Sequence, residues 1–273
     1  MLHTQRPGVG GSSHAPFGDA HFWEERYVKE RKSTSTVEWY TDWEAMRLYV
    51  VPYLSETKKD RILQIGCGMS ELAAALYRDG YKNVTSVDIS ESAIDFQKRK
   101  FGRWEGLQYQ VADVTKLDAF PDQTFDVVIG KACIDSLFCS YSCVFAVQRA
   151  LTEVHRLLKD GGRFFSISHG SNRTRYPHFT RPEFSWKCQV VTLSDQFQHY
   201  MYYCKRPTEE QLEQERKARL KLALKGERVL SVPCRFPAKE AAEAEEERKR
   251  AIVAAKKAYE EHARKRRQSM AAI

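Results

Sequence analysis

Glycines and aspartates that directly follow apolar stretches are the residues of this sequence best suited to hold a ligand. The run Gly66-Cys67-Gly68-Met69-Ser70 follows the apolar stretch "RILQI", and its glycines allow a sharp turn with a ligand against bare backbone. Ser70 opens an amphipathic helix whose positive dipole end faces the same place. Many glycine motifs of this kind form only a tight turn and bind no ligand, so the motif alone is weak evidence for a binding site.

Two aspartates strengthen the prediction because each ends an expected strand. Asp88 lies 22 residues after Gly66, near the spacing at which an acidic residue meets ribose hydroxyls. Asp113 ends the next strand, where an adenine amino group can donate to it. With their neighbours Ile89 and Val114, they are predicted to bind a nucleotide-like cofactor. The competing interpretations are a helix cap for Asp88 and a solvent-facing turn for Asp113.

The fourth expected strand ends in "VVIGKACIDSL". This places Lys131 beside the cofactor and Asp135 where a second substrate would approach. A helix-capping role is the structural alternative for Asp135. No metal site is predicted, because the seven cysteines include no CxxC pair.

Two further nucleotide-binding classes fit less well. A dehydrogenase shares the glycine loop and the aspartate, but the third glycine of GxGxxG is missing, since Glu71 stands there, and no Tyr-xxx-Lys follows. A P-loop is excluded because GxxxxGK[ST] does not occur. The remaining loop set is that of an S-adenosylmethionine-dependent methyltransferase.

Apolar strands and amphipathic helices alternate after residue 60, which predicts an α/β fold with a mostly parallel sheet covered on both faces. Residues 186–206 alternate polar and apolar positions and are expected to append an antiparallel hairpin. Two short helices should precede the sheet. A long helix is expected to stop at Asp160–Gly162. The expected strands are 61–65, 84–89, 107–114, 125–130, 163–168, 186–193 and 197–206.

Composition divides the chain into three parts. Residues 1–18 are rich in Gly, Ser, Pro and His and are expected to be a flexible tail. Residues 19–206 form the predicted domain, and 207–273 a charged helical extension that begins with a capping box at Thr208 and Gln211. Residues 239–267 carry ten basic and seven acidic side chains, with few large apolar ones, and are predicted to form a solvated helix.

The overall composition sets outer bounds on function. With 42% apolar residues in 273, the chain can fill one core of ordinary size. Its net charge of +8 permits attraction to nucleic acid or acidic surfaces without selecting among them. No apolar run reaches 18 residues and the odd cysteine count suggests no disulfide framework, so a cytoplasmic protein without a membrane span is expected.

The motifs "LQIGCGMSEL", "VTSVDIS", "VADVTKLDAFPDQTFDVVIGKACIDSL" and "VHRLLKDGGRFFSIS" occur in the order found in class I methyltransferases. Together with "FWEERY" and "VEWYTDW" upstream, they resemble the branch that includes the elongation factor 1-alpha lysine methyltransferases, particularly the type associated with endothelin-converting enzyme 2. The resemblance covers roughly residues 20–206. It implies a Rossmann-like fold with a seven-stranded sheet.

The resemblance also implies roles for the upstream aromatic residues. Trp23, Tyr27 and Trp39 would fold over the methionine end of S-adenosylmethionine, and Arg26 would meet its carboxylate. Simple core packing is the alternative for these aromatics. This chain departs from the wider superfamily at Gln64, where many members carry an acid, and in its cysteine-rich "FCSYSC" segment.

Protein-lysine methylation, with elongation factor 1-alpha as a candidate partner, is the function that the resemblance implies. An acceptor lysine must first lose a proton, and Asp135 is predicted to orient its amine. Methylation of exocyclic base amines is disfavoured because "IGKA" replaces the usual Asn/Asp-Pro-Pro-Tyr/Phe motif, although the basic C-terminal helix can attract RNA. The sequence also leaves open a small-molecule methyltransferase and an inactive interaction protein with this fold.

Overall fold

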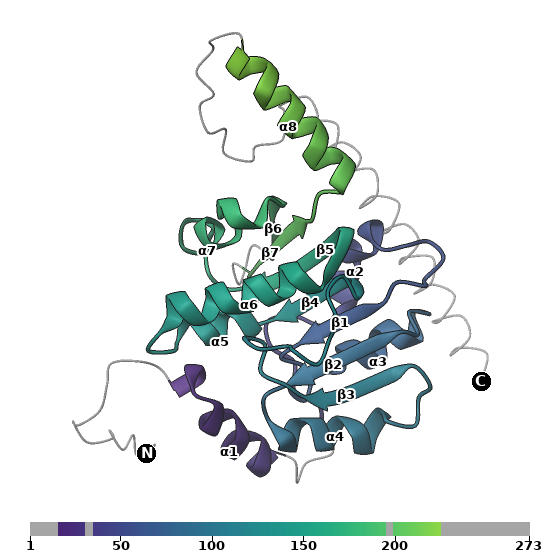
Figure 1. The fold of residues 1–273 in the computed structure, drawn as a ribbon. Helices are drawn as coiled ribbons and strands as arrows, with labels where there is room; N and C mark the ends of the chain where they lie inside the picture. Colours follow the sequence, from purple (N-terminus) through teal and green to yellow (C-terminus); the bar gives the residue numbers. More distant parts are fainter. Residues whose placement is uncertain (1–15, 31–34, 195–198, 225–273) are drawn as a thin grey trace.

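The sheet at the centre of the molecule follows from the continuous apolar strands of the sequence. The computed structural model describes residues 16–30, 35–194 and 199–224 (Figure 1). Strand β1 (Ile62–Ile65) is buried at every position, and β4 (Phe125–Lys131) at all positions except Asp126. Strands without an exposed face need cover on both sides, which the helices provide.

Seven strands form one mixed sheet, in the order β3-β2-β1-β4-β5-β7-β6. β1 to β5 are parallel, whereas β7 is antiparallel to both β5 and β6. The predicted mostly parallel sheet with a C-terminal hairpin is therefore confirmed. The second strand of the hairpin, not the first, lies beside β5. The remaining strands are β2 (Val84–Asp88), β3 (Leu107–Val111), β5 (Leu158–Ser168), β6 (Lys187–Ser194) and β7 (His199–Lys205).

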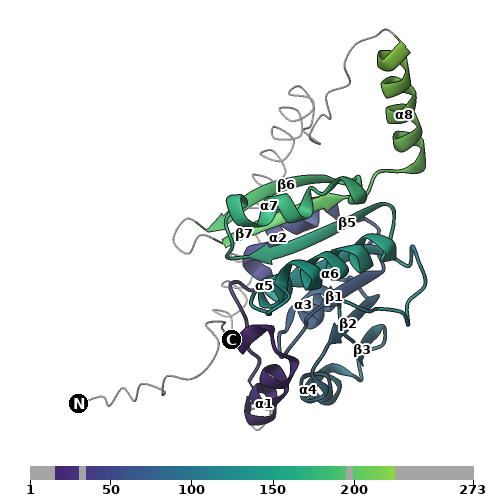
Figure 2. The same cartoon turned by 60° about the vertical axis from the view of Figure 1, so that its left-hand side comes forward.

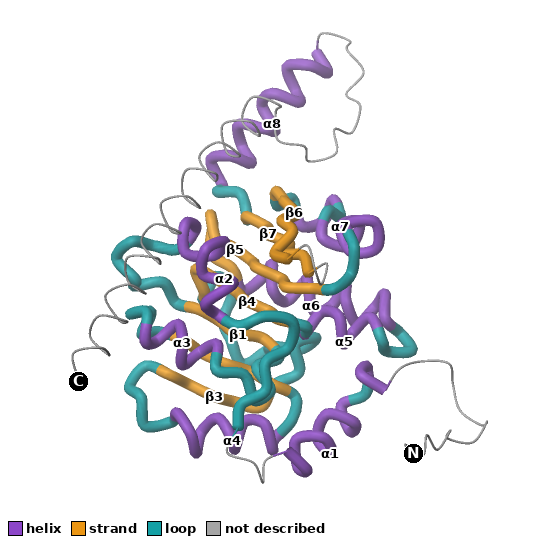
Figure 3. The backbone as a smooth tube through the Cα atoms, turned by 180° about the vertical axis from the view of Figure 1, so that it is seen from behind, coloured by secondary structure: helices purple, strands orange, loops and turns teal. Residues whose placement is uncertain are grey.

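Helices cover the two faces of the sheet in separate groups. Figure 3 shows α2 (Trp43–Val50) and α3 (Leu72–Arg78) in front of the sheet, and α4 (Glu91–Phe101) packs on the same side. Figure 1 shows α6 (Cys143–Leu157) on the opposite face, where α5 (Cys133–Phe138) and α7 (Asn172–Phe179) also pack. In Figure 1, α1 (Ala20–Glu30) lies toward the strand ends marked by the arrowheads. Short 3-10 turns span Pro16–Gly18 (η1), Val51–Tyr53 (η2) and Pro182–Phe184 (η3).

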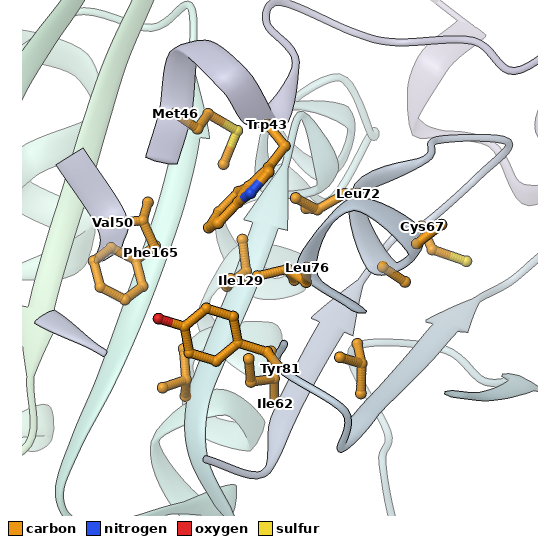
Figure 4. Close-up of a cluster of buried hydrophobic side chains, with 14 of the residues drawn as sticks. Trp43, Met46, Val50, Ile62, Cys67, Leu72, Leu76, Tyr81, Ile129 and Phe165 are labelled. Carbon is orange, nitrogen blue, oxygen red and sulfur yellow. The ribbon is translucent and has the colours of Figure 1, made fainter. Parts of the chain in front are cut away.

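The core beneath α2 fixes the helix that follows the aromatic segment. Trp43 and Met46 of α2 point toward Leu76 of α3 and Ile129 of β4 (Figure 4). Trp43 is 4% exposed and also donates from Nε1 to Asp79 Oδ2 at 2.8 Å. Burial of one such large side chain contributes about 1.5–3 kcal/mol. This packing anchors the chain immediately after Trp39 and Tyr40.

The long helix ends earlier than the sequence pattern predicts. The expected stop is Asp160–Gly162, but α6 ends at Leu157 and β5 begins at Leu158. Leu158 is fully buried, has extended backbone and pairs with Phe125 of β4. Pairing with the sheet therefore takes precedence over continuation of the helical pattern at this residue.

The capping box predicted near the start of the C-terminal segment is confirmed. Thr208 and Gln211 form the reciprocal capping box, with N–H to side-chain distances of 3.0 and 3.3 Å. Helix α8 (Glu209–Leu224) leads away from the sheet (Figure 2). The helix predicted over 239–267 and most of the predicted tail, residues 1–15, lie outside the described residues. Among the described helices, none combines the length and apolar character needed to cross a membrane.

Candidate functional site

A pocket lies at the C-terminal ends of the parallel strands, and its empty volume is about 720 Å³ including the open mouth. It is lined by residues of four strand ends, of α1 and α5, and of the segment before α2. Most of the residues predicted to bind the cofactor meet here, although they come from distant parts of the chain. Nine of them line it: Trp23, Tyr27, Trp39, Gly66, Asp88, Ile89, Asp113, Val114 and Lys131.

The glycine loop requires both of its glycines. Gly66 and Gly68 have φ angles of +61° and +46°, a region that residues with a Cβ rarely adopt. A Cβ on Gly66 would lie 2.7 Å from Cβ of Cys133, and one on Gly68 would collide with the Tyr27 hydroxyl. Gly66 lines the pocket, whereas Gly68 lies behind the lining. Gly68 therefore supports the site from behind.

Asp88 is held by the glycine loop and by the next helix. Its Oδ2 accepts from Gly68 N–H at 2.7 Å, and its Oδ1 accepts from Ser90 N–H at 3.0 Å. Burial raises the pKa of this carboxyl, while the hydrogen bonds from Ser90 and Gly68 act in the opposite direction. Each carboxylate oxygen has a second lone pair, so ribose hydroxyls can still donate to it.

Asp113 lies at the next strand end and is exposed. Its Oδ1 accepts from Thr115 N–H at 2.8 Å, which fixes the carboxylate at the pocket wall. Val114 is 8% exposed and Ile89 is 40% exposed. These two provide apolar surface beside the acids, which suits a flat purine ring.

Aromatic rings form the wall contributed by the N-terminal segment. Trp23 stacks on Tyr27 with ring centroids 5.7 Å apart, and Trp39 meets Trp23 edge-on at 5.8 Å. Trp23 also donates from Nε1 to Phe17 O at 2.7 Å, so η1 closes one end of the pocket. The sequence pattern assigns residues 16–18 to the flexible tail, yet Phe17 and Gly18 line this pocket.

Arg26 does not line the pocket, although it was predicted to meet the methionine carboxylate. Its Nε donates to Glu30 Oε1 at 2.9 Å, and its guanidinium lies 5.0 Å from the centroid of the Trp39 ring. Lys131 does line the pocket and pairs with Glu38, which lies in the same "VEWYTDW" segment as Trp39. Burial lowers the pKa of Lys131 and the Glu38 charge opposes that shift.

Asp135 also lies outside the pocket lining. It is 3% exposed, and its two oxygens accept five hydrogen bonds, from Tyr40, Ser168, Arg175 and both the backbone and the ring of His169. Burial tends to raise its pKa, but the Ser168 hydrogen bond and the Arg175 charge prevail, so its pKa is lowered. This carboxylate is ionised and well supplied with donors.

Glu38 and Gln97 were missed by sequence reasoning. Glu38 accepts from Ser70 Oγ at 2.9 Å and from Glu71 N–H at 2.6 Å, besides pairing with Lys131. Gln97 donates to the carbonyls of Gly68 and Ser70, both at 2.8 Å. An acid next to Trp39 was the one visible signal. Its partners lie more than thirty positions away, beyond the reach of local patterns.

The pocket has the features that S-adenosylmethionine requires. It offers a backbone turn with positive φ angles, a buried carboxylate that can accept from hydroxyl groups, an exposed acid beside apolar surface, and an aromatic wall. Within the described part of the chain, no group of His, Cys, Asp and Glu could hold a metal ion, and the six described cysteines are free. Fold and pocket together define a class I S-adenosylmethionine-dependent methyltransferase.

Comparisons with known proteins give the family. A family model described as "Methyltransferase domain" matches residues 63–166. EEF1A lysine methyltransferase 4 of Mus musculus is 32% identical over 195 residues, which cover 68% of this chain and 74% of that protein. The eEF1A lysine and N-terminal methyltransferase of Mus musculus is 37% identical over 159 residues, covering 56% of this chain and 22% of that larger protein. The chain belongs to the methyltransferase family that contains these proteins.

A solved structure supports the fold. The phosphoethanolamine N-methyltransferase 1 of Haemonchus contortus, in complex with phosphoethanolamine and S-adenosylhomocysteine, superposes with a TM-score of 0.51. The match covers 70% of this chain and 49% of that chain at 16% identity. Likeness at this level of identity concerns the architecture of the domain.

Proposed function

We propose that this chain is a protein-lysine N-methyltransferase of the cytoplasm and that elongation factor 1-alpha is its acceptor. The observation that carries the proposal is the 32% identity over 195 residues to a relative named as an EEF1A lysine methyltransferase. The aromatic segment adds support, because Trp23, Tyr27 and Trp39 meet in one pocket with Asp88.

Different residues of the pocket bind different parts of the cofactor. S-adenosylmethionine, when bound, supplies a methyl group on a sulfonium sulfur. The neutral thioether that remains after transfer of the methyl group is an excellent leaving group. Asp88 accepts from the ribose hydroxyls, Asp113 takes the adenine end with Ile89 and Val114, and Gly66 allows close approach of backbone. The aromatic wall excludes water and holds the methionine end still.

Two cations are candidates for the methionine carboxylate. Lys131 borders the pocket and must share its charge between that carboxylate and Glu38. Arg26 lies behind the Trp39 ring and must leave Glu30 to take part. We therefore assign the direct contact to Lys131 and keep Arg26 as a residue that holds the aromatic wall.

A labelling experiment distinguishes a protein acceptor from RNA, a metabolite or no acceptor at all. The chain is incubated with methyl-labelled S-adenosylmethionine and a cell lysate, and protein, RNA and small-molecule fractions are counted. Label is expected in one protein band of the size of elongation factor 1-alpha. Label confined to RNA or to metabolites would show that the acceptor is not a protein. No label in any fraction, with cofactor binding intact, would favour an inactive interaction protein.

Trp39→Ala should lower the affinity for S-adenosylmethionine by about tenfold, roughly 1.4 kcal/mol. The substitution removes an aromatic face from the pocket and the ring on which Arg26 rests. Titration calorimetry measures the affinity, and tryptophan fluorescence should change on binding to the unmodified chain. Trp104→Ala is the control, because Trp104 packs on Tyr77 and Phe101 away from the pocket. Equal affinities of both variants would contradict the aromatic wall.

Truncation after Gly226 should leave cofactor affinity within a few-fold of the full chain. Helix α8 leads away from the sheet, and its described side chains are exposed except for Leu212, which is half-buried. We propose that residues 207–273 serve acceptor choice, because the basic cluster 264–267 suits a contact that weakens with salt. Titration calorimetry measures the cofactor affinity of the truncated chain. Capture of the acceptor at increasing salt concentration measures acceptor binding. Loss of cofactor binding on truncation would mean that the extension supports the domain.

A further inference from the structure

Tyr40, Asp135 and His169 form a closed triangle of polar atoms beside the pocket. His169 Nδ1 lies 2.7 Å from Asp135 Oδ2, and the Tyr40 hydroxyl lies 3.0 Å from the same oxygen. The Tyr40 hydroxyl also lies 2.7 Å from His169 Nδ1. Three polar atoms from three distant segments are thus within hydrogen-bond distance of one another.

The hydrogen-bond partners of the triangle determine which ring nitrogen of neutral His169 carries the hydrogen. The Asp135 pKa is lowered, so its oxygens carry no proton and act only as acceptors. A bare Nδ1 lone pair 2.7 Å from Oδ2 would face another lone pair, so Nδ1 must carry the hydrogen. The Tyr40 hydroxyl donates its single hydrogen to Oδ2 and accepts from Nδ1. The lone pair of neutral His169 is therefore on Nε2, on the far side of the ring from Asp135.

The charged and titratable groups around His169 come from four different parts of the fold. Asp135 belongs to α5, Arg175 to α7 and His199 to β7, while Tyr40 precedes α2. Burial, then the Asp135 charge, raises the pKa of Tyr40, so its hydroxyl remains a donor. Burial, then His169, lowers the pKa of His199. Asp135 is the one carboxylate among these groups.

This triangle adjoins the pocket through two connections. Ala132 N–H donates to Ile167 O at 3.0 Å, which places the pocket residues Ala132 and Cys133 next to the end of β5. Trp39 lines the pocket, and its ring centroid lies 6.3 Å from that of Tyr40. The His169 side chain is 57% exposed, so an acceptor arriving from solvent can reach it.

We propose that His169, held by Asp135 and Tyr40, accepts the proton of the acceptor amine. The inference rests on the proposed function, since a lysine ammonium has no lone pair until a proton leaves. One proton passes from the ammonium to Nε2 and later to solvent. The amine lone pair then forms the nitrogen–carbon bond, while the carbon–sulfur bond breaks with its electron pair going to sulfur. Asp135 acts through His169 as a positioning residue.

Initial rates with purified elongation factor 1-alpha and saturating S-adenosylmethionine test this role. His169→Ala and His169→Gln should each lower the rate at pH 7 by about 10²-fold or more. The defect should shrink at about pH 10, where about a quarter of a free lysine amine, with its pKa of about 10.4, is already neutral. Added imidazole should restore part of the His169→Ala rate. His178→Ala is the control, since the His178 ring lies against Phe138 and is not among the five hydrogen-bond donors to Asp135.

A second measurement needs no acceptor. Nitrogen-15 spectra of the imidazole rings should show His169 with its hydrogen on Nδ1, and calorimetry should show unchanged cofactor affinity in His169→Ala. An Nε2–H tautomer, or a rate defect equally large at both pH values and insensitive to imidazole, would overturn the proposal. If the unmodified chain does not methylate elongation factor 1-alpha, the proposed acceptor fails, and the same variants are compared on the protein that the lysate experiment labels.

Discussion

Asp88→Ala is expected to weaken S-adenosylmethionine binding by about 10²- to 10⁴-fold. Asp88 is 7% exposed at the pocket wall, and each lost hydrogen bond to an ionised group is worth about 1.5–3 kcal/mol. Two ribose hydroxyls give two such bonds, hence roughly 3–6 kcal/mol. Titration calorimetry measures the affinity, and thermal unfolding shows whether the fold survives.

The matched controls for Asp88 separate ribose binding from support of the glycine loop. Asp88→Asn keeps one oxygen for Gly68 N–H while losing the charge, so it should retain the fold and still bind weakly. Asp118→Ala removes an exposed acid elsewhere and should leave affinity unchanged. Because burial raises the pKa of Asp88, affinity should fall on acidification at a higher pH than for an ordinary carboxyl. Unaltered affinity in a folded Asp88→Ala protein would remove the ribose assignment.

Asp135→Ala is expected to lower the free energy of unfolding by about 3–5 kcal/mol, the usual effect of removing one partner from a buried ion pair. The Arg175 side chain is 12% exposed and would lose its carboxylate, and the Ser168 hydroxyl would lose its acceptor. Denaturant unfolding measures the change. Asp118→Ala, which breaks an exposed pair with Lys116, should change stability by less than about 1 kcal/mol.

The contribution of Asp135 to the free energy of unfolding should depend on pH in one direction. Its pKa is lower in the folded protein, so its stabilisation is complete above the ordinary carboxyl pKa of about 3.9 and is lost as pH falls through the lowered value. The difference between the unmodified chain and Asp135→Ala should thus be constant near neutral pH and narrow in acid. A difference that grows in acid would contradict this assignment of charge.

The strand ends were the predictable part of the site, because parallel strands bring successive loops to one edge of a sheet. Gly66, Asp88, Asp113 and Lys131 end consecutive strand segments, so their meeting follows from topology. The aromatic wall was expected from the family resemblance rather than from spacing. The hairpin was predicted, but its order was not, since alternation does not say which strand pairs with β5.

The side-chain partners of the site were less predictable. Asp135 follows Lys131 closely in sequence, yet Ala132 has a φ of +64° and redirects the chain at the start of α5. The carboxylate then meets Ser168, His169 and Arg175, all more than thirty residues away. Such contacts depend on how helices pack over the sheet. No local pattern in "KACIDSL" distinguishes a carboxylate facing the pocket from one facing β5.

The most direct test of the proposed activity is methylation of purified elongation factor 1-alpha by this chain. The factor is incubated with methyl-labelled S-adenosylmethionine and either the unmodified chain or Asp88→Asn, and its peptides are analysed by mass spectrometry. We predict labelled methyl groups on a lysine side chain with the unmodified chain and at least about 10²-fold slower labelling with the variant at limiting cofactor. Equal labelling by both proteins, or label on residues other than lysine, would contradict lysine methylation through this pocket.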